Sequence, residues 1–113
     1  MKTPVFVCTG FLDSGKSTLV KETLMNQDWI EPGLTLLILC EEGEVEYSEK
    51  YLNENNMTLV KVDEFEQLNS AFFKNCEKNY RPAQVVIEYN GMWKLEDLLM
   101  IRYPRNWALQ GVY

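Results

Sequence analysis

Histidine is absent from this chain of 113 residues, and several other features are scarce. Without an imidazole, His-based acid–base catalysis and His-ligated zinc sites are excluded. The three cysteines have no C-x-x-C spacing, which favours reduced thiols over a disulfide framework. No apolar run approaches the roughly 20 residues of a membrane span, and Gly, Asp and Lys interrupt the N-terminal apolar stretch too early for a signal peptide. We therefore expect a cytoplasmic protein.

Positive charge is also scarce, with 11 Lys+Arg against 17 Asp+Glu and a formal net charge of −6. Nucleic acids and anionic membranes are bound by basic surfaces, so we expect neither as a partner. The content of 46% apolar and 25% charged residues is typical of a globular protein. A chain of this length can bury one core but hardly two, and we interpret residues 1–113 as a single domain.

Short apolar runs alternate with helical patterns along the chain. The runs predict strands at Thr3–Thr9, Leu34–Cys40, Thr58–Val62, Gln84–Glu88 and Trp107–Tyr113. Helical spacing between them predicts helices at Lys16–Gln27, Ser48–Asn55, Glu64–Asn79 and Gly91–Ile101. This alternation predicts an α/β fold with a mostly parallel sheet. Because the last strand lacks a covering helix, we expect the domain to be truncated after its fifth strand.

A glycine-rich loop from Gly10 to Ser17 matches the phosphate-binding pattern G-x-x-x-x-G-K-[ST], with the required strand before it and helix after it. Its glycines allow backbone N–H groups to point into one anion-sized hollow. We expect Lys16 to bind the β and γ phosphates and Ser17 to ligate Mg²⁺. The alternative is an ordinary strand-to-helix turn. The predicted nucleotide-binding residues of this loop are Gly10, Asp13, Ser14, Gly15, Lys16, Ser17 and Thr18.

Two further acidic segments follow predicted strands. Glu88 ends the fourth strand, where phosphate-loop proteins carry an acid that holds Mg²⁺, and the N–H of Gly91 would face the γ-phosphate. The alternative is a helix cap. Glu42 and Glu44 follow the second strand, at the sheet edge where ligands bind. They are candidate ligands of a divalent metal or parts of a switch loop, whereas a solvated charge run is the other interpretation.

Together these segments resemble the CobW-type P-loop GTPases, which are related to UreG and HypB. The resemblance rests on four segments, which occur in this order: GFLDSGKSTLV, GE in the loop after the second predicted strand (hereafter the acidic loop), VVIEYNG and WALQGVY. It implies a three-layer P-loop NTPase fold, GTP hydrolysis with Mg²⁺, and delivery of a transition metal to a metalloprotein client. It implies Lys16 and Glu88 as catalytic residues, with Gly91 in the γ-phosphate switch and Glu44 at the GE of the acidic loop.

The chain also departs from this family. VKVDEFEQLN stands where family members carry a C-x-C-C metal motif, and no N/T-K-x-D guanine motif is found, which matches a domain lacking its base-recognition segment. Asp13 replaces the usual glycine. Its carboxylate would repel phosphate, so we expect it to be turned away, protonated or neutralised by a cation. In the similar loop of translation-factor GTPases, the side chain helps to hold a monovalent cation beside the phosphates, and this resemblance implies the same role for Asp13.

Two other functions remain open at this point. A P-loop small-molecule kinase uses the same loop but needs an arginine-rich lid, for which only Arg81, Arg102 and Arg105 are available. A truncated, non-catalytic nucleotide-binding module is the third interpretation.

Overall fold

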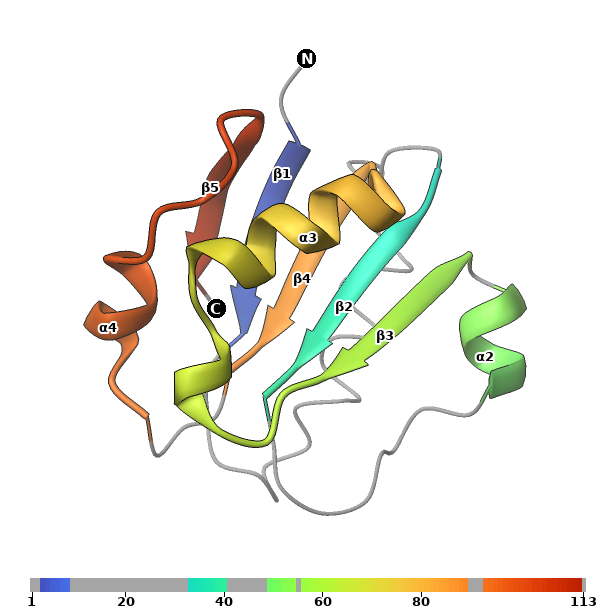
Figure 1. Ribbon diagram of the computed structural model, residues 1–113. Helices are drawn as coiled ribbons and strands as arrows, with labels where there is room; N and C mark the ends of the chain where they lie inside the picture. Colours follow the sequence, from blue (N-terminus) through green and yellow to red (C-terminus); the bar gives the residue numbers. More distant parts are fainter. Residues whose placement is uncertain (1–2, 9–32, 41–48, 55, 90–92, 113) are drawn as a thin grey trace.

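The computed structural model describes residues 3–8, 33–40, 49–54, 56–89 and 93–112. Five strands in this part of the chain form one parallel sheet in the order β3-β2-β4-β1-β5 (Figure 1). The strands are β1 (Thr3–Cys8), β2 (Thr35–Leu39), β3 (Met57–Lys61), β4 (Gln84–Glu88) and β5 (Trp107–Val112). Each lies where its apolar run predicts it, and the predicted α/β fold with a parallel sheet is confirmed.

The inner strands β2 and β4 are buried along their whole length. A strand covered on both faces needs apolar side chains on both, which explains why these strands read as continuous apolar runs rather than as an alternation. Gln84 is an exception at the start of β4. Its Nε2 donates a hydrogen bond to Oγ1 of Thr35 on β2, so the buried amide has a partner within the sheet.

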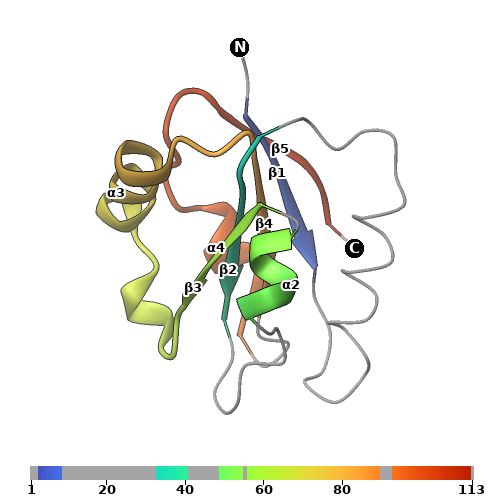
Figure 2. The same cartoon turned by 90° about the vertical axis from the view of Figure 1, so that its right-hand side faces the viewer.

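Helices cover the sheet on both faces and give the fold three layers (Figure 2). On one face, α3 (Ser70–Tyr80) and α4 (Leu95–Leu99) pack on the larger core cluster, to which α3 contributes Phe73. On the other face, α2 (Glu49–Glu54) packs through Leu52 on a smaller cluster. Successive residues of the strands alternate between the two clusters, as the pleat requires. The predicted helix Ser48–Asn55 corresponds to α2, and the predicted helix Lys16–Gln27 lies outside the described residues.

The helix predicted at Glu64–Asn79 is wrong in its first part. The chain instead forms a 3₁₀ turn, η1 (Phe65–Gln67), and then begins α3 at Ser70. Asn69 separates the two with an extended backbone (φ −150°, ψ 176°), and its side chain accepts a hydrogen bond from the N–H of Phe72 at 2.9 Å. An asparagine that caps the following helix in this way ends the preceding helical turn.

The helix predicted at Gly91–Ile101 is also shorter in the structure. α4 spans Leu95–Leu99, while residues 90–92 lie outside the described part of the chain. Lys94 has an extended backbone (φ −77°, ψ 126°), and its carbonyl accepts a hydrogen bond from the Tyr89 hydroxyl at 2.8 Å. The ring of Trp93 packs edge-on against Tyr89 at 5.7 Å. These contacts hold Trp93 and Lys94 at the start of α4, outside the helix.

An aromatic cluster joins α3 to the segment before β5. The ring of Phe73 lies 4.7 Å from Tyr103 and 5.6 Å from Trp107. Beside it, Oε1 of Glu77 accepts hydrogen bonds from Nδ2 of Asn106 at 3.0 Å and from Nε1 of Trp107 at 2.8 Å. These contacts connect residues far apart in the sequence and determine where α3 lies on the sheet.

Replacing Phe73 by alanine should therefore destabilise the fold strongly. Its side chain is fully buried, and loss of a buried phenylalanine costs about 3–5 kcal/mol. We expect a loss of this size in the free energy of unfolding measured with urea. Tyr80→Ala on the same helix is the control, because that side chain is 36% exposed and surface changes cost about 0.5 kcal/mol. Equal losses for the two variants would contradict the packing of α3 described above.

Candidate functional site

The carboxyl ends of β1, β2 and β4 meet at one edge of the sheet, the lower edge in Figure 1. Glu88, the last residue of β4, is paired in register with Cys8 on one side and with Leu39 on the other. The carbonyl of Glu88 accepts a hydrogen bond from the N–H of Cys40 at 2.9 Å, and the N–H of Tyr89 donates to the carbonyl of Cys8 at 2.8 Å. Glu88 is thus held between the strand that leads into the glycine-rich loop and the strand that leads into the acidic loop.

Glu88 is fully buried, with 0% of its surface exposed. In the part of the chain that the structure describes, it is the one Asp, Glu, Lys or Arg in the buried class. By the alternation of β4 it shares a sheet face with Val86 and with Cys8, which belong to the smaller core cluster. Burying a carboxylate costs much free energy unless hydrogen bonds or a cation compensate for the lost water. The structure thus places a buried acid at the carboxyl ends of the strands, next to the end of β1.

The other predicted site residues lie outside the described residues. This applies to the whole glycine-rich loop and to the two loops that follow β2 and β4, so their proximity to Glu88 stays a prediction. The residues concerned are Gly10, Asp13, Ser14, Gly15, Lys16, Ser17, Thr18, Glu42, Glu44 and Gly91. In the described segments, no group of three or more Cys, Asp or Glu side chains is arranged to hold a metal ion. The structure therefore tests only the placement of Glu88.

The three cysteines are free and buried. Cys8 packs in the smaller core cluster and Cys40 in the larger one, on opposite faces of the sheet. The thiols of Cys8 and Cys40 therefore lie on either side of the end of β4 without facing each other, although β1 and β2 end at the same edge of the sheet. Cys76 packs in the core beneath α3, as its position on the apolar helix face predicts.

Tyr89, directly after β4, is a further residue of this edge. It lies on the face opposite Glu88 and is 1% exposed, although a tyrosine directly after a strand carries no strong burial signal. Burial, and then the charges of Cys40 and Asp97, raise the pKa of its hydroxyl to about 12. Because this hydroxyl stays protonated and donates to the carbonyl of Lys94, Tyr89 is unsuited to act as a hydrolytic base at neutral pH.

Two other acidic groups in the core have raised pKa values. Burial raises the pKa of the Cys76 thiol to about 11. Burial, with smaller effects from Tyr89 and Cys40, raises the pKa of Tyr103 above its usual range. The Tyr103 hydroxyl donates a hydrogen bond to the carbonyl of Leu98 at 2.8 Å, which also requires the protonated form. Folding thus depends on the neutral form of several core groups.

Among the described helices, none combines the length and the apolar content needed to cross a bilayer. Comparison of the chain with known protein families, with curated proteins and with solved structures finds no match to any of them.

The raised pKa values predict that stability falls in alkaline solution. Cys76 ionises near pH 9 when unfolded and near pH 11 when folded. Above pH 9 the unfolded state therefore binds fewer protons, and the free energy of unfolding decreases by up to about 1.4 kcal/mol per pH unit for each such group. Urea unfolding between pH 8 and 10.5 would measure this decrease. Tyr103→Phe keeps the ring and removes one ionisable group, so the free energy of unfolding of this variant should decrease less at the upper end of this pH range. The same pH dependence in the variant and the wild type would contradict a raised pKa of Tyr103.

Proposed function

We propose that this chain binds a nucleoside triphosphate, GTP in the first place, with Mg²⁺, and hydrolyses it as CobW-type GTPases do. The observation that carries the proposal is the position of Glu88. This buried carboxylate ends the strand next to β1, and it is paired in register with Cys8, two residues before Gly10. An acid at the end of a strand beside a phosphate loop is the arrangement in which a magnesium–triphosphate complex is held.

Each residue of the proposed site has a separate role. Lys16 places its ammonium against the β and γ phosphates and offsets their negative charge. Backbone N–H groups of the loop from Gly10 to Ser17 hold the remaining phosphate oxygens. The N–H of Gly91 contacts the γ-phosphate, so that loss of this group on hydrolysis changes the loop after β4.

The donor set fits Mg²⁺ as the bound metal. This ion prefers oxygen ligands and is commonly held by one or two protein oxygens together with phosphates and water. Glu88 supplies a carboxylate and Ser17 a hydroxyl, which satisfies this preference. When bound, Mg²⁺ supplies positive charge to the β and γ phosphates.

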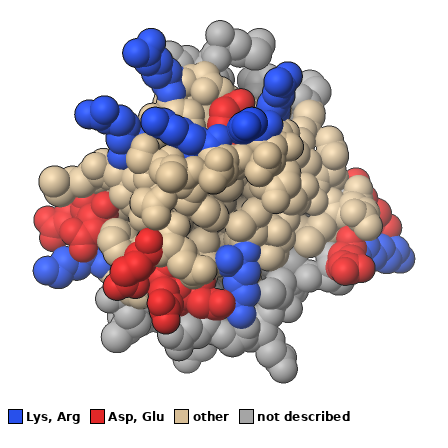
Figure 3. All heavy atoms as spheres, viewed as in Figure 1, with Lys and Arg blue, Asp and Glu red and all other residues tan. Residues whose placement is uncertain are grey.

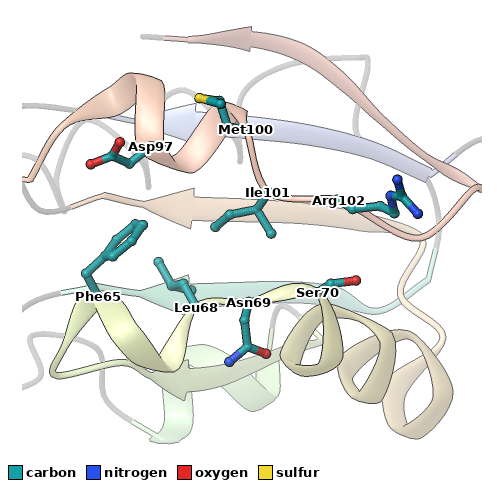
Figure 4. A pocket seen from close by; sticks show the side chains of 8 residues that line it. All are labelled: Phe65, Leu68, Asn69, Ser70, Asp97, Met100, Ile101 and Arg102. Atoms are coloured by element: carbon teal, nitrogen blue, oxygen red, sulfur yellow. The ribbon is translucent and has the colours of Figure 1, made fainter.

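The positions of the arginines argue against the kinase alternative. A kinase lid would bring arginine to the carboxyl edge, where the phosphates lie. Arg81 instead precedes β4, and Arg105 precedes β5, so both lie at the amino ends of the strands, opposite Glu88. Arg102 lies at the same end of the molecule (Figure 4). Metal delivery to a metalloprotein client extends the proposal on the sequence resemblance alone.

Lys16→Ala should remove most of the affinity for triphosphate. One charge-assisted contact to phosphate is worth about 1.5–3 kcal/mol, which corresponds to roughly a tenfold to hundredfold weaker Kd. Calorimetry with GTP and ATP, with and without Mg²⁺, measures the change and also decides between the two bases. Lys21→Ala, from the region after the loop, is the charge-matched control. Equal affinity of the wild type and Lys16→Ala would refute the phosphate-loop assignment.

Glu88→Gln should lower the effect of Mg²⁺ on nucleotide binding while leaving a folded protein. The amide has nearly the same volume but no charge to attract the cation. The measurement is the ratio of GTP affinities with and without Mg²⁺, after circular dichroism has shown an unchanged fold. A folded variant with the wild-type ratio would favour a purely structural role for Glu88. Nucleotide binding without turnover in the wild type would instead identify the non-catalytic module.

A further inference from the structure

An open groove of about 440 Å³ lies between η1 and α3 on one side and α4 with the residues after it on the other (Figure 4). Its middle is apolar, because Leu68 and Ile101 face each other there, and Phe65 lies toward one end. Ser70 and Arg102 lie on opposite sides of the groove toward its other end. The groove therefore has an apolar centre, with the cation of Arg102 at one end and the carboxylate of Asp97 toward the other.

Exposed apolar surface continues outside this groove on α4 and just after it. Met100, which lines the groove, is 84% exposed, and Leu99 beside it is 42% exposed. A methionine is flexible and polarisable, which suits it to contact with apolar side chains of a partner. Met100 thus adds exposed apolar surface at the edge of the groove.

A row of cations begins at the Arg102 end of the groove. Lys74 and Lys78 follow Ser70 along α3 at intervals of four residues, so these three side chains share one helix face, and both lysines are exposed. Arg81 caps the end of the helix. Figure 3 shows Lys and Arg side chains gathered along this end of the molecule, whereas Asp and Glu gather toward the lower edge.

Contacts across the core bring α3 and the arginine-bearing segment together. Phe73 of α3 packs on Tyr103, which lies between Arg102 and Arg105 in the sequence. The acid within this row, Glu77, accepts hydrogen bonds from Asn106 and Trp107 and is half-buried. All three arginines of a chain with a net charge of −6 thus lie at one end of the fold.

We propose that the groove and this row of cations form a docking surface for an acidic segment of a partner protein. The segment places an apolar side chain between Leu68 and Ile101 and its carboxylates against Arg102, Lys74 and Lys78. From Ser70 to Lys78 the helix rises about 12 Å, which an extended segment covers with about four residues.

Charge complementarity selects this occupant. A phosphate polymer would pair with the cations but would leave the apolar centre of the groove uncovered. An acidic segment with one apolar residue satisfies both parts of the surface.

The basic end of the docking surface is separate from the proposed nucleotide site. Arg81 and Arg105 precede β4 and β5, whereas Glu88 ends β4 at the opposite edge of the sheet. The inference therefore does not rest on nucleotide binding.

The test uses a fluorescein-labelled peptide in which glutamates flank a central leucine, with the affinity for the purified protein measured by fluorescence anisotropy. Lys74→Glu with Lys78→Glu should weaken binding roughly fivefold or more, because two favourable ion pairs become repulsive. Lys50→Glu with Lys94→Glu changes the net charge equally at exposed positions outside the row and should leave the affinity within about twofold. Met100→Ser, and a peptide with serine in place of leucine, should each weaken binding as well.

Several results would overturn the proposal. One is an equal loss for the two charge-reversed proteins, which would show attraction by net charge alone. Another is equal affinity for the leucine and serine peptides, which would show that the groove is not used. Tighter binding of an RNA oligonucleotide of equal charge, lost in the Lys74 and Lys78 variant, would identify a phosphate polymer as the ligand. Absence of peptide binding at low salt would also refute the docking surface.

Discussion

The parallel pairing of β4 with both β1 and β2 is the constraint on which the rest of the structure depends. It buries β4 on both faces and places its last residue, Glu88, between two other strand ends. Because backbone hydrogen bonds continue beyond the strands at Cys40 and Tyr89, the ends of the three strands are tied together. The proposed magnesium–triphosphate site lies at this junction, where Glu88 is the acid next to the end of β1.

The same sheet separates charge between its two edges. Proposed phosphate-binding residues follow the carboxyl ends of the strands, while Arg81 and Arg105 stand before β4 and β5. A chain with an acidic net charge can thus carry a locally basic surface, because side chains distant in the sequence gather at one end. The low count of Lys and Arg argues against nucleic-acid binding by the surface as a whole, but the net charge does not give the local charge of each region of that surface.

Sequence patterns predicted the strands well and the helices less well. A short, continuous apolar run such as Thr35–Leu39 is typical of a strand that is buried on both faces of a parallel sheet. Helical spacing across Glu64–Asn79 was correct for Cys76 in the core, yet it could not reveal that Asn69 caps α3 and interrupts the pattern. The short α4 depends on Tyr89 and Trp93, whose contacts are made only in the folded chain.

The sequence by itself determined the alternation of strands and helices, the glycine-rich loop and the acid at the end of the fourth strand, because these are encoded by residue types at short spacing. Only the tertiary structure decided which strands are neighbours, since the order β3-β2-β4-β1-β5 follows from long-range pairing. That order places Glu88 beside the end of β1. The position of α3 beside the segment that carries Arg102 likewise depends on the packing of Phe73 against Tyr103, a contact between residues that no local pattern connects.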